Sequence, residues 1–188
     1  MSTTGWIVLI VVVAIVVIAA VWLYLRSRQS KQLKEHFGPE YDRTVQQADK
    51  RRDAEAELES RRKRVAQLDI RPLSATDRTR YANAWQQLQP TFVDDPSSAV
   101  NQADALVGQL MEARGYPVGD FDQRAADISV DHPEIVSNYR EAHRLATRNE
   151  TGDATTEEQR RAIIHYRKLF DELMGDAVAD PTSTGRVS

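Results

Sequence analysis

The sequence contains no cysteine among its 188 residues. A disulfide framework, a zinc–thiolate site, an iron–sulfur cluster and a cysteine nucleophile are therefore excluded. Its few glycines form no G-x-x-x-x-G-K-[ST] or G-x-G-x-x-G phosphate loop and no G-x-S-x-G nucleophile motif. No segment alternates apolar and polar residues with a period of two, so no strand is predicted. The sequence predicts an all-α protein.

One long apolar run stands out at the amino-terminal end. Residues 6–25 carry no charged or amide side chain. As a helix, twenty residues span about 30 Å, the thickness of the hydrocarbon core of a bilayer. Trp6, Trp22 and Tyr24 lie near its ends, where amphipathic rings favour the headgroup layer, and Leu25 is its last residue. We predict a transmembrane helix over residues 6–25.

The flanks of this run predict its orientation. Residues 1–5 are uncharged, whereas four basic residues and no acidic residue follow the run before Glu35; they are Arg26, Arg28, Lys31 and Lys34. The positive-inside rule places the amino terminus outside and the remainder in the cytoplasm of a single-pass cell-membrane protein. A cleaved signal peptide would require a basic start and a small-residue cleavage site, which the sequence lacks. The opposite orientation stays open.

The next two segments are rich in charge. Residues 26–38 form a basic juxtamembrane collar, and residues 39–70 contain no glycine or proline after Pro39, which predicts one charged stalk helix. Its apolar stripe is thin and has a polar gap at Asp49–Asp53. A solvated stalk is the main interpretation, and self-association through a coiled coil is the alternative.

Residues 71–175 predict a small antiparallel helical bundle with short linkers. Start signals occur at Ser74, at Asp95-Pro96 and at Asp131-His132-Pro133, and Thr155 with Glu158 forms a capping box. Pro90 should kink or end the helix that contains it, and stop signals occur at Arg114-Gly115, at Gly152 and at Gly175. A further short helix is expected over residues 121–128. Residues 176–188 lack periodicity, and we predict that they are disordered.

The four histidines show no His-x-x-x-His or Glu-x-x-His spacing. His143 and His165 come together only if their helices pack in one register. A small hydrolytic or metal-dependent enzyme built on them is therefore the weakest alternative, and we predict no catalytic residue, metal site, cofactor or small-molecule ligand.

Two other features suggest partners. Basic clusters at residues 50–52 and 61–64 are flanked by acidic residues, and residues 35–188 hold 21 basic against 28 acidic side chains, so nucleic-acid binding is not expected. Trp85 lies in an aromatic stripe with Tyr81 and Phe92. Such a stripe is typical of a core, but an exposed Trp85 would be a candidate partner surface.

Five short motifs carry a family resemblance: Phe37-Gly-Pro-Glu-Tyr-Asp-Arg43, Leu68-Asp-Ile-Arg-Pro-Leu73, Phe92-Val-Asp-Asp-Pro96, Arg114-Gly-Tyr-Pro117 and Ser129-Val-Asp-His-Pro133. Over residues 35–174 the chain resembles a widespread bacterial family of membrane-anchored or exported small α-helical proteins. The resemblance implies a bacterial protein and transfers no activity.

The sequence thus favours a membrane-tethered protein-interaction or scaffold module without catalysis, with the lipid bilayer and an unknown protein as partners. The main alternative is an exported, anchored envelope or stress protein.

Overall fold

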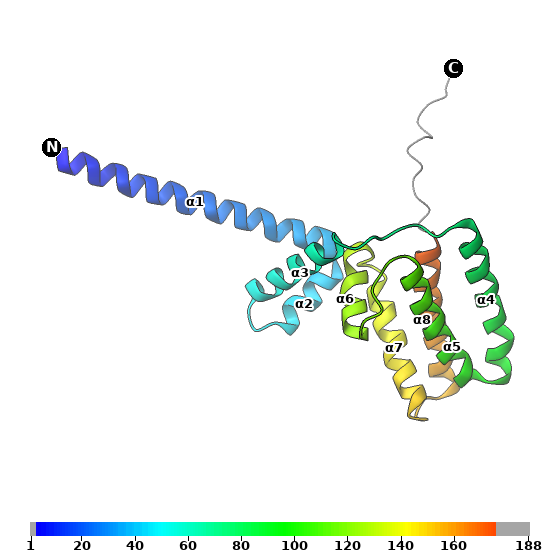
Figure 1. Cartoon of the computed structure of the whole chain (residues 1–188). Helices are drawn as coiled ribbons and strands as arrows, with labels where there is room; N and C mark the ends of the chain where they lie inside the picture. The colour runs from blue at the N-terminus through cyan, green and yellow to red at the C-terminus, as the bar shows by residue number, and fades with distance from the viewer. Residues whose placement is uncertain (1–2, 176–188) are drawn as a thin grey trace, which may run out of the picture. The chain divides into compact units, whose positions relative to one another are not determined.

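The computed structural model describes the backbone of residues 3–175 and the side chains of these residues except 3–5, 7–11, 14, 22 and 26. The predicted disordered tail, 176–188, lies outside the described residues. Within them the chain forms eight helices and no strand, which confirms the all-α prediction (Figure 1). The chain divides into two compact units, residues 1–59 and residues 60–188.

The first unit is built from a long helix and two short ones. Helix α1 (Thr3–Phe37) contains the apolar run and the basic collar as far as Phe37 without a break. Gly38 then turns the chain with a φ of 47°, a conformation that favours glycine, and Pro39 starts α2 (Pro39–Gln47) at its first turn. Helix α3 (Arg51–Val65) follows a three-residue turn, and its residues up to Glu59 belong to this unit.

Among the residues that the structure describes, none of the helices is both long enough and apolar enough to cross a membrane. Several side chains of the apolar run, those of residues 7–11, 14 and 22, lie outside the described set. The transmembrane helix therefore stays a prediction.

The prediction of one continuous stalk helix is wrong. The chain leaves the helical conformation at residues 48–50, where the polar gap of the stripe begins, because no large apolar side chain there holds a straight helix against a neighbour. The apolar positions on either side, Tyr41, Ala54 and Leu58, are buried within the single chain. A coiled coil along residues 39–70 would need both an unbroken helix and this stripe left exposed.

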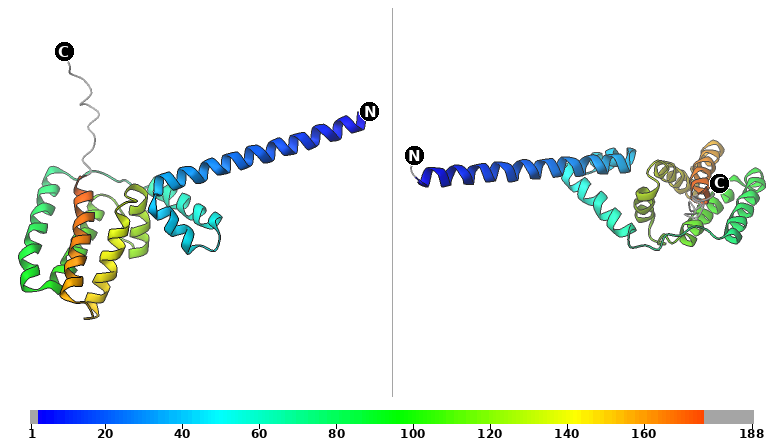
Figure 2. Two further views of the ribbon diagram at one scale, coloured as in Figure 1. Left: turned by 180° about the vertical axis from the view of Figure 1, so that it is seen from behind. Right: turned by 90° about the horizontal axis from the view of Figure 1, so that it is seen from above.

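The second unit is a helical bundle. It contains α4 (Ala75–Asp94), α5 (Pro96–Ala113), α6 (Phe121–Asp131), α7 (Val136–Glu150) and α8 (Thr156–Gly175). Helix α5 packs against α4, α7 and α8, and α7 packs against α6 and α8 (Figure 2). One core of aliphatic and aromatic side chains joins them, with Tyr139, Tyr166 and Leu110 among its most buried members. This confirms the predicted bundle.

The predicted helix signals mostly have their expected structures. Ser74 accepts a hydrogen bond from the Asp77 amide at 3.0 Å, and Asp95 accepts one from the Ser98 amide at 3.0 Å. Thr155 and Glu158 cap each other reciprocally at the start of α8. Each of these bonds satisfies an amide that has no partner inside its helix.

The signal at Asp131-His132-Pro133 was read wrongly, and Pro90 does not end its helix. Helix α4 runs through Pro90 to Asp94, because hydrogen bonds from the Thr91 hydroxyl to the Gln87 carbonyl and from the Asp95 amide to the Thr91 carbonyl hold its last turn. Asp131-His132-Pro133 ends α6 and does not start α7. The His132 amide bonds to the Ile128 carbonyl, and the residue before a proline avoids the helical conformation.

The boundary between the two units follows Glu59, which is earlier in the chain than the predicted domain boundary at residues 70/71. The segment that follows Glu59 is tied to the bundle. Arg64 forms an ion pair of 2.7 Å with Asp127 of α6, whose side chain is fully buried, and the Arg71 amide bonds to the Arg114 carbonyl at 2.9 Å. These contacts assign residues 60–70 to the second unit.

Candidate functional site

The residues predicted to anchor the chain lie along α1. Trp6, Tyr24 and Leu25 are all more than half exposed, while the side chains of Trp22 and Arg26 lie outside the described residues. Four consecutive residues of the run, Ile15 to Ile18, have exposed fractions between 54% and 68%. Since successive helical residues point about 100° apart, this exposed apolar surface encircles the helix.

The described collar residues behave differently from one another. Arg28 and Lys31 are exposed and make no described hydrogen bond or ion pair. Lys34 donates a hydrogen bond to Asp42 of α2 at 3.1 Å and lies 5.9 Å from the centre of the Tyr41 ring. The collar therefore offers Arg28 and Lys31 to solvent, whereas Lys34 is engaged within the first unit.

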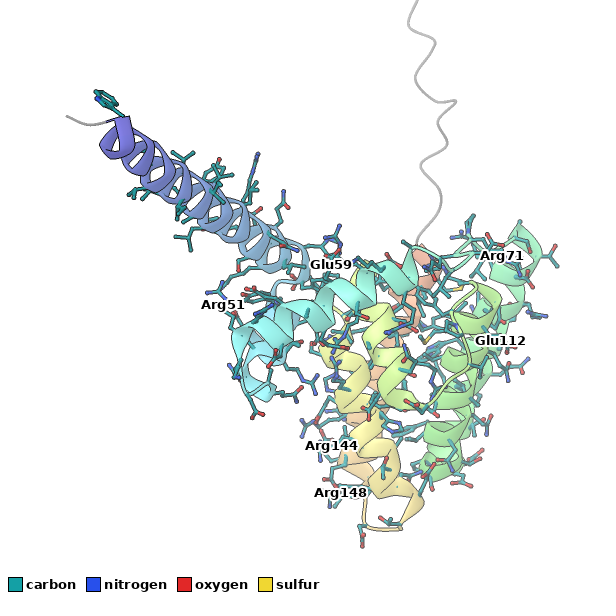
Figure 3. All side chains as sticks on the ribbon, turned by 60° about the vertical axis from the view of Figure 1, so that its left-hand side comes forward. Arg51, Glu59, Arg71, Glu112, Arg144 and Arg148 are labelled. Atoms are coloured by element: carbon teal, nitrogen blue, oxygen red, sulfur yellow. The ribbon has the colours of Figure 1, made fainter. Side chains whose placement is uncertain are left out.

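A polar network ties the three helices of the first unit together around the Glu55 carboxylate of α3. Its Oε1 atom accepts hydrogen bonds from the Ser30 hydroxyl, from the Tyr41 hydroxyl at 2.8 Å and from Arg51 Nε at 2.8 Å. Arg51 Nε also donates to the Tyr41 hydroxyl, and Arg51 Nη2 donates to the Ser30 hydroxyl at 3.1 Å. We call these four residues the Glu55 network; Figure 3 labels Arg51 at the start of α3.

The network shifts the acidities of its own members. Burial by itself raises the pKa of Glu55, but hydrogen bonds from Ser30, Tyr41 and Arg51 outweigh burial and hold this pKa below its ordinary value. Burial and the bond to Glu55 raise the pKa of Tyr41, and the hydrogen bond to Glu55 raises the pKa of Arg51. At neutral pH the network is a carboxylate, a phenol and a guanidinium, held together by charge-assisted bonds.

A cleft of about 500 Å³ opens beside this network within the first unit. Six residues line it: Leu23, Ser27, Ser30, Lys31, Arg51 and Glu55. Those from α1 recur at helical spacing and so share one face of the helix. The cleft combines two cations with one carboxylate, which gives it a net positive charge.

Only part of this site could be predicted from the sequence. Lys31 belongs to the predicted basic collar, but Ser30, Tyr41, Arg51 and Glu55 were not predicted, because a straight stalk would carry Arg51 and Glu55 away from the collar. The polar gap at residues 49–53 was the signal for a turn that would bring them back.

Trp85 does not provide the candidate partner surface. Its side chain is only 3% exposed, and its ring lies 4.6 Å from that of Phe170 in the bundle core. The guanidinium of Arg167 covers the pair, 5.3 Å from the centre of the Trp85 ring. The apolar face of α4 is used inside the bundle, as is usual for an aromatic stripe at helical spacing.

The histidines of the bundle have separate partners. His143 stacks on Phe121 with ring centres 3.7 Å apart, and His165 Nδ1 lies 2.9 Å from the Asn138 side-chain oxygen. Burial lowers the pKa of His165. Over the part of the chain that the structure describes, no three His, Asp or Glu side chains come together in a group that could hold a metal ion.

The bundle offers a shallow groove between α4 and α5. Its volume is about 330 Å³, and its lining joins apolar side chains to charged ones: Arg80, Tyr81, Ala84, Leu106, Gln109, Glu112 and Ala113. The Tyr81 hydroxyl is fixed by a hydrogen bond to the Gln109 carbonyl at 3.0 Å. The groove therefore presents apolar and charged groups together on the surface of the bundle.

Comparisons with known proteins give no relative: no family model, no curated protein and no solved structure matches the chain. The resemblance carried by the five motifs stays a prediction. Function is therefore inferred from the residues of this chain.

Proposed function

We propose that the protein is a single-pass membrane protein whose helical bundle serves as a tethered interaction module. The observation that carries the proposal is the apolar run at residues 6–25, followed at once by a basic collar. The exposed apolar surface around Ile15 to Ile18 supports it. A helix that is apolar on all sides is stable only where lipid or protein covers it, because burying such a side chain is worth about 1.5–3 kcal/mol.

The proposal includes an orientation. Uncharged residues 1–5 lie outside, and the basic collar and the bundle lie in the cytoplasm. Acidic lipid attracts Lys and Arg near the membrane surface at about 1 kcal/mol each, whereas the net negative charge of residues 35–188 disfavours contact of the bundle with the same surface. The anchor thus holds the bundle close to the bilayer and leaves its surface free for a protein partner.

The absence of cysteine permits a clean topology test. Single cysteines are introduced as Thr4→Cys, ahead of the apolar run, and as Asp153→Cys, in the exposed turn between α7 and α8. A membrane-impermeant maleimide is then added to right-side-out and inside-out membrane vesicles. We expect label at Thr4→Cys in right-side-out vesicles only and at Asp153→Cys in inside-out vesicles only. The reverse pattern would favour the exported alternative, and recovery of the full-length chain in a detergent-free supernatant would refute the anchor.

The interaction role is tested at the groove of α4 and α5. A photo-crosslinking residue replaces exposed Gln109 in the groove, and a control replaces exposed Arg160 on α8. We expect a specific crosslinked band, from a partner or a second copy, at Gln109 and none at Arg160. Equal or absent crosslinking at both positions contradicts a partner surface in the groove.

A further inference from the structure

We propose that the cleft beside the Glu55 network binds the phosphate group of an acidic phospholipid. This inference rests on the proposed membrane anchor and adds a ligand to it. The cleft lies entirely within the first unit, and its lining runs from Leu23, inside the apolar run, to Lys31 in the collar.

The depth of the cleft matches the headgroup layer. Ser27 and Ser30 lie two and five residues beyond Leu25, which is about 3–8 Å further along a helix. The headgroup layer of a bilayer is about 5–8 Å thick on each side of the hydrocarbon core. An anchor that ends at Leu25 therefore brings the two serines to the level of the lipid phosphates. Lys31 lies about 9 Å beyond Leu25, and its long side chain can reach back to this level because helical side chains tilt toward the N-terminus. Leu23 lies at the acyl-chain level.

The donors of the cleft suit a phosphate. Lys31 is exposed and makes no described hydrogen bond, so its ammonium is available to a ligand. Arg51 Nε donates to Glu55 and to the Tyr41 hydroxyl, and one hydrogen of Arg51 Nη2 is donated to the Ser30 hydroxyl. Since a guanidinium carries five N–H groups, both hydrogens of Nη1 and one of Nη2 remain for a second acceptor. Planar pairs of donors of this kind match phosphate oxygens.

The Glu55 network holds Arg51 in place before the ligand arrives. Three hydrogen bonds fix its guanidinium to α1, α2 and α3, so little side-chain freedom is lost on binding. The three bonds to Oε1 of Glu55 also hold the one carboxylate of the cleft among donors of its own network. The net positive charge that remains favours an acidic lipid over a zwitterionic one, whose own cation would be repelled.

The test uses the full-length protein in a neutral detergent, titrated with phosphatidylglycerol or with phosphatidylcholine. Bound lipid is counted by native mass spectrometry. The cleft variant Lys31→Gln/Arg51→Gln is compared with Arg28→Gln/Arg52→Gln. The control removes the same charge from the same two helices at exposed positions outside the cleft. We expect about tenfold weaker phosphatidylglycerol binding for the cleft variant and little change for the control, because charge-assisted bonds to phosphate are lost only in the first.

Several outcomes overturn the proposal. An equal loss of phosphatidylglycerol binding in both double variants would show that the basic collar attracts acidic lipid diffusely, without a defined cleft. Such a diffuse attraction should weaken at least as much when Arg28, the residue nearer the apolar run, loses its charge. Equal binding of the two lipids would remove the selectivity for acidic headgroups. Displacement of the lipid by equimolar glycerol 3-phosphate would show that the cleft takes a soluble phosphate ester.

Two further measurements separate failure of the cleft from failure of the fold or the anchor. Lys31→Gln alone breaks no described bond and keeps the Glu55 network, so its weaker binding counts for the cleft even if Arg51→Gln disturbs α3. Extraction of the wild-type chain from membranes by alkaline carbonate would refute the anchor. If the chain stays in the membrane and both cleft variants bind lipid as tightly as the wild type, the lipid site in the cleft is refuted and the anchor is not.

Discussion

A substitution at Gly115 tests how closely the chain is packed after α5. Gly115 has a φ of 96°, and a Cβ built on it would lie 2.1 Å from the carbonyl oxygen of Asp69. An alanine there therefore meets two costs. The left-handed conformation costs an L-residue about 1–2 kcal/mol, and forced displacement of a neighbouring backbone costs about 1–3 kcal/mol more. We expect Gly115→Ala to destabilise the bundle by about 2–5 kcal/mol.

Gly152 provides the matched control. It also ends a helix with a positive φ, 77°, but a Cβ at Gly152 would have no atom within 4 Å. Gly152→Ala should therefore cost only the conformational part, about 1–2 kcal/mol. Thermal unfolding of the full chain is followed by Trp85 fluorescence after Trp6 and Trp22 are replaced by phenylalanine. The Tm of Gly115→Ala should be lower than that of Gly152→Ala by about 3–15 °C, because the extra cost of about 1–3 kcal/mol corresponds to roughly 3–5 °C per kcal/mol for a unit of this size. Equal Tm values would refute the close approach of Gly115 to Asp69.

Three more expectations concern the core and the charged contacts. Trp85→Ala should lower the unfolding free energy of the bundle by about 3–5 kcal/mol in urea titrations, because it leaves a cavity beside Phe170; a loss below 1 kcal/mol would contradict the buried position. Arg64→Gln should lower the unfolding free energy of the bundle by about 2–4 kcal/mol, since it leaves the fully buried Asp127 carboxylate without its cation. In the same urea titration, the double variant Arg64→Gln/Asp127→Asn should lose less, because it removes the buried charge as well. The pKa of Glu55 is lower in the folded protein than in the unfolded chain, so its stabilisation is present above the unfolded pKa and disappears as the pH falls through the lower, folded value. The protection of α3 amides from hydrogen exchange, measured relative to the intrinsic exchange rate at each pH, should fall over that acidic range, and a Glu55→Gln variant should show a flatter pH dependence.

Local signals in the sequence were sufficient for most of the bundle. The caps at Ser74, Asp95 and Thr155 could be predicted because each acts within three residues of its own amide. The open outcome at Pro90 and the error at His132 have one source. A proline alone does not show whether a helix continues past it, ends before it or begins at it, because the hydrogen bonds of neighbouring residues decide this.

The candidate site was harder to predict because it depends on the return of the chain after α2. Charge and hydropathy define the apolar run and the collar, and these identified Lys31. The residues opposite it, Arg51 and Glu55, were predicted to lie on a solvated stalk, where such residues form a favourable i,i+4 pair and need no other partner. Only the turn at residues 48–50 brings that pair to Ser30 and Tyr41.

In the proposed anchor, the continuity of α1 would set the position of the cleft relative to the bilayer. No glycine or proline occurs between Gly5 and Gly38, so nothing in this stretch favours a kink or a swivel. In the proposed anchor, the depth of the apolar run then sets the depth of Ser27 and Lys31, and the helical phase of the run sets the direction in which they face. The network around Glu55 supplies the opposite wall from α3. The same uninterrupted helix would therefore hold the chain in the membrane and align a cationic cleft with the lipid phosphates.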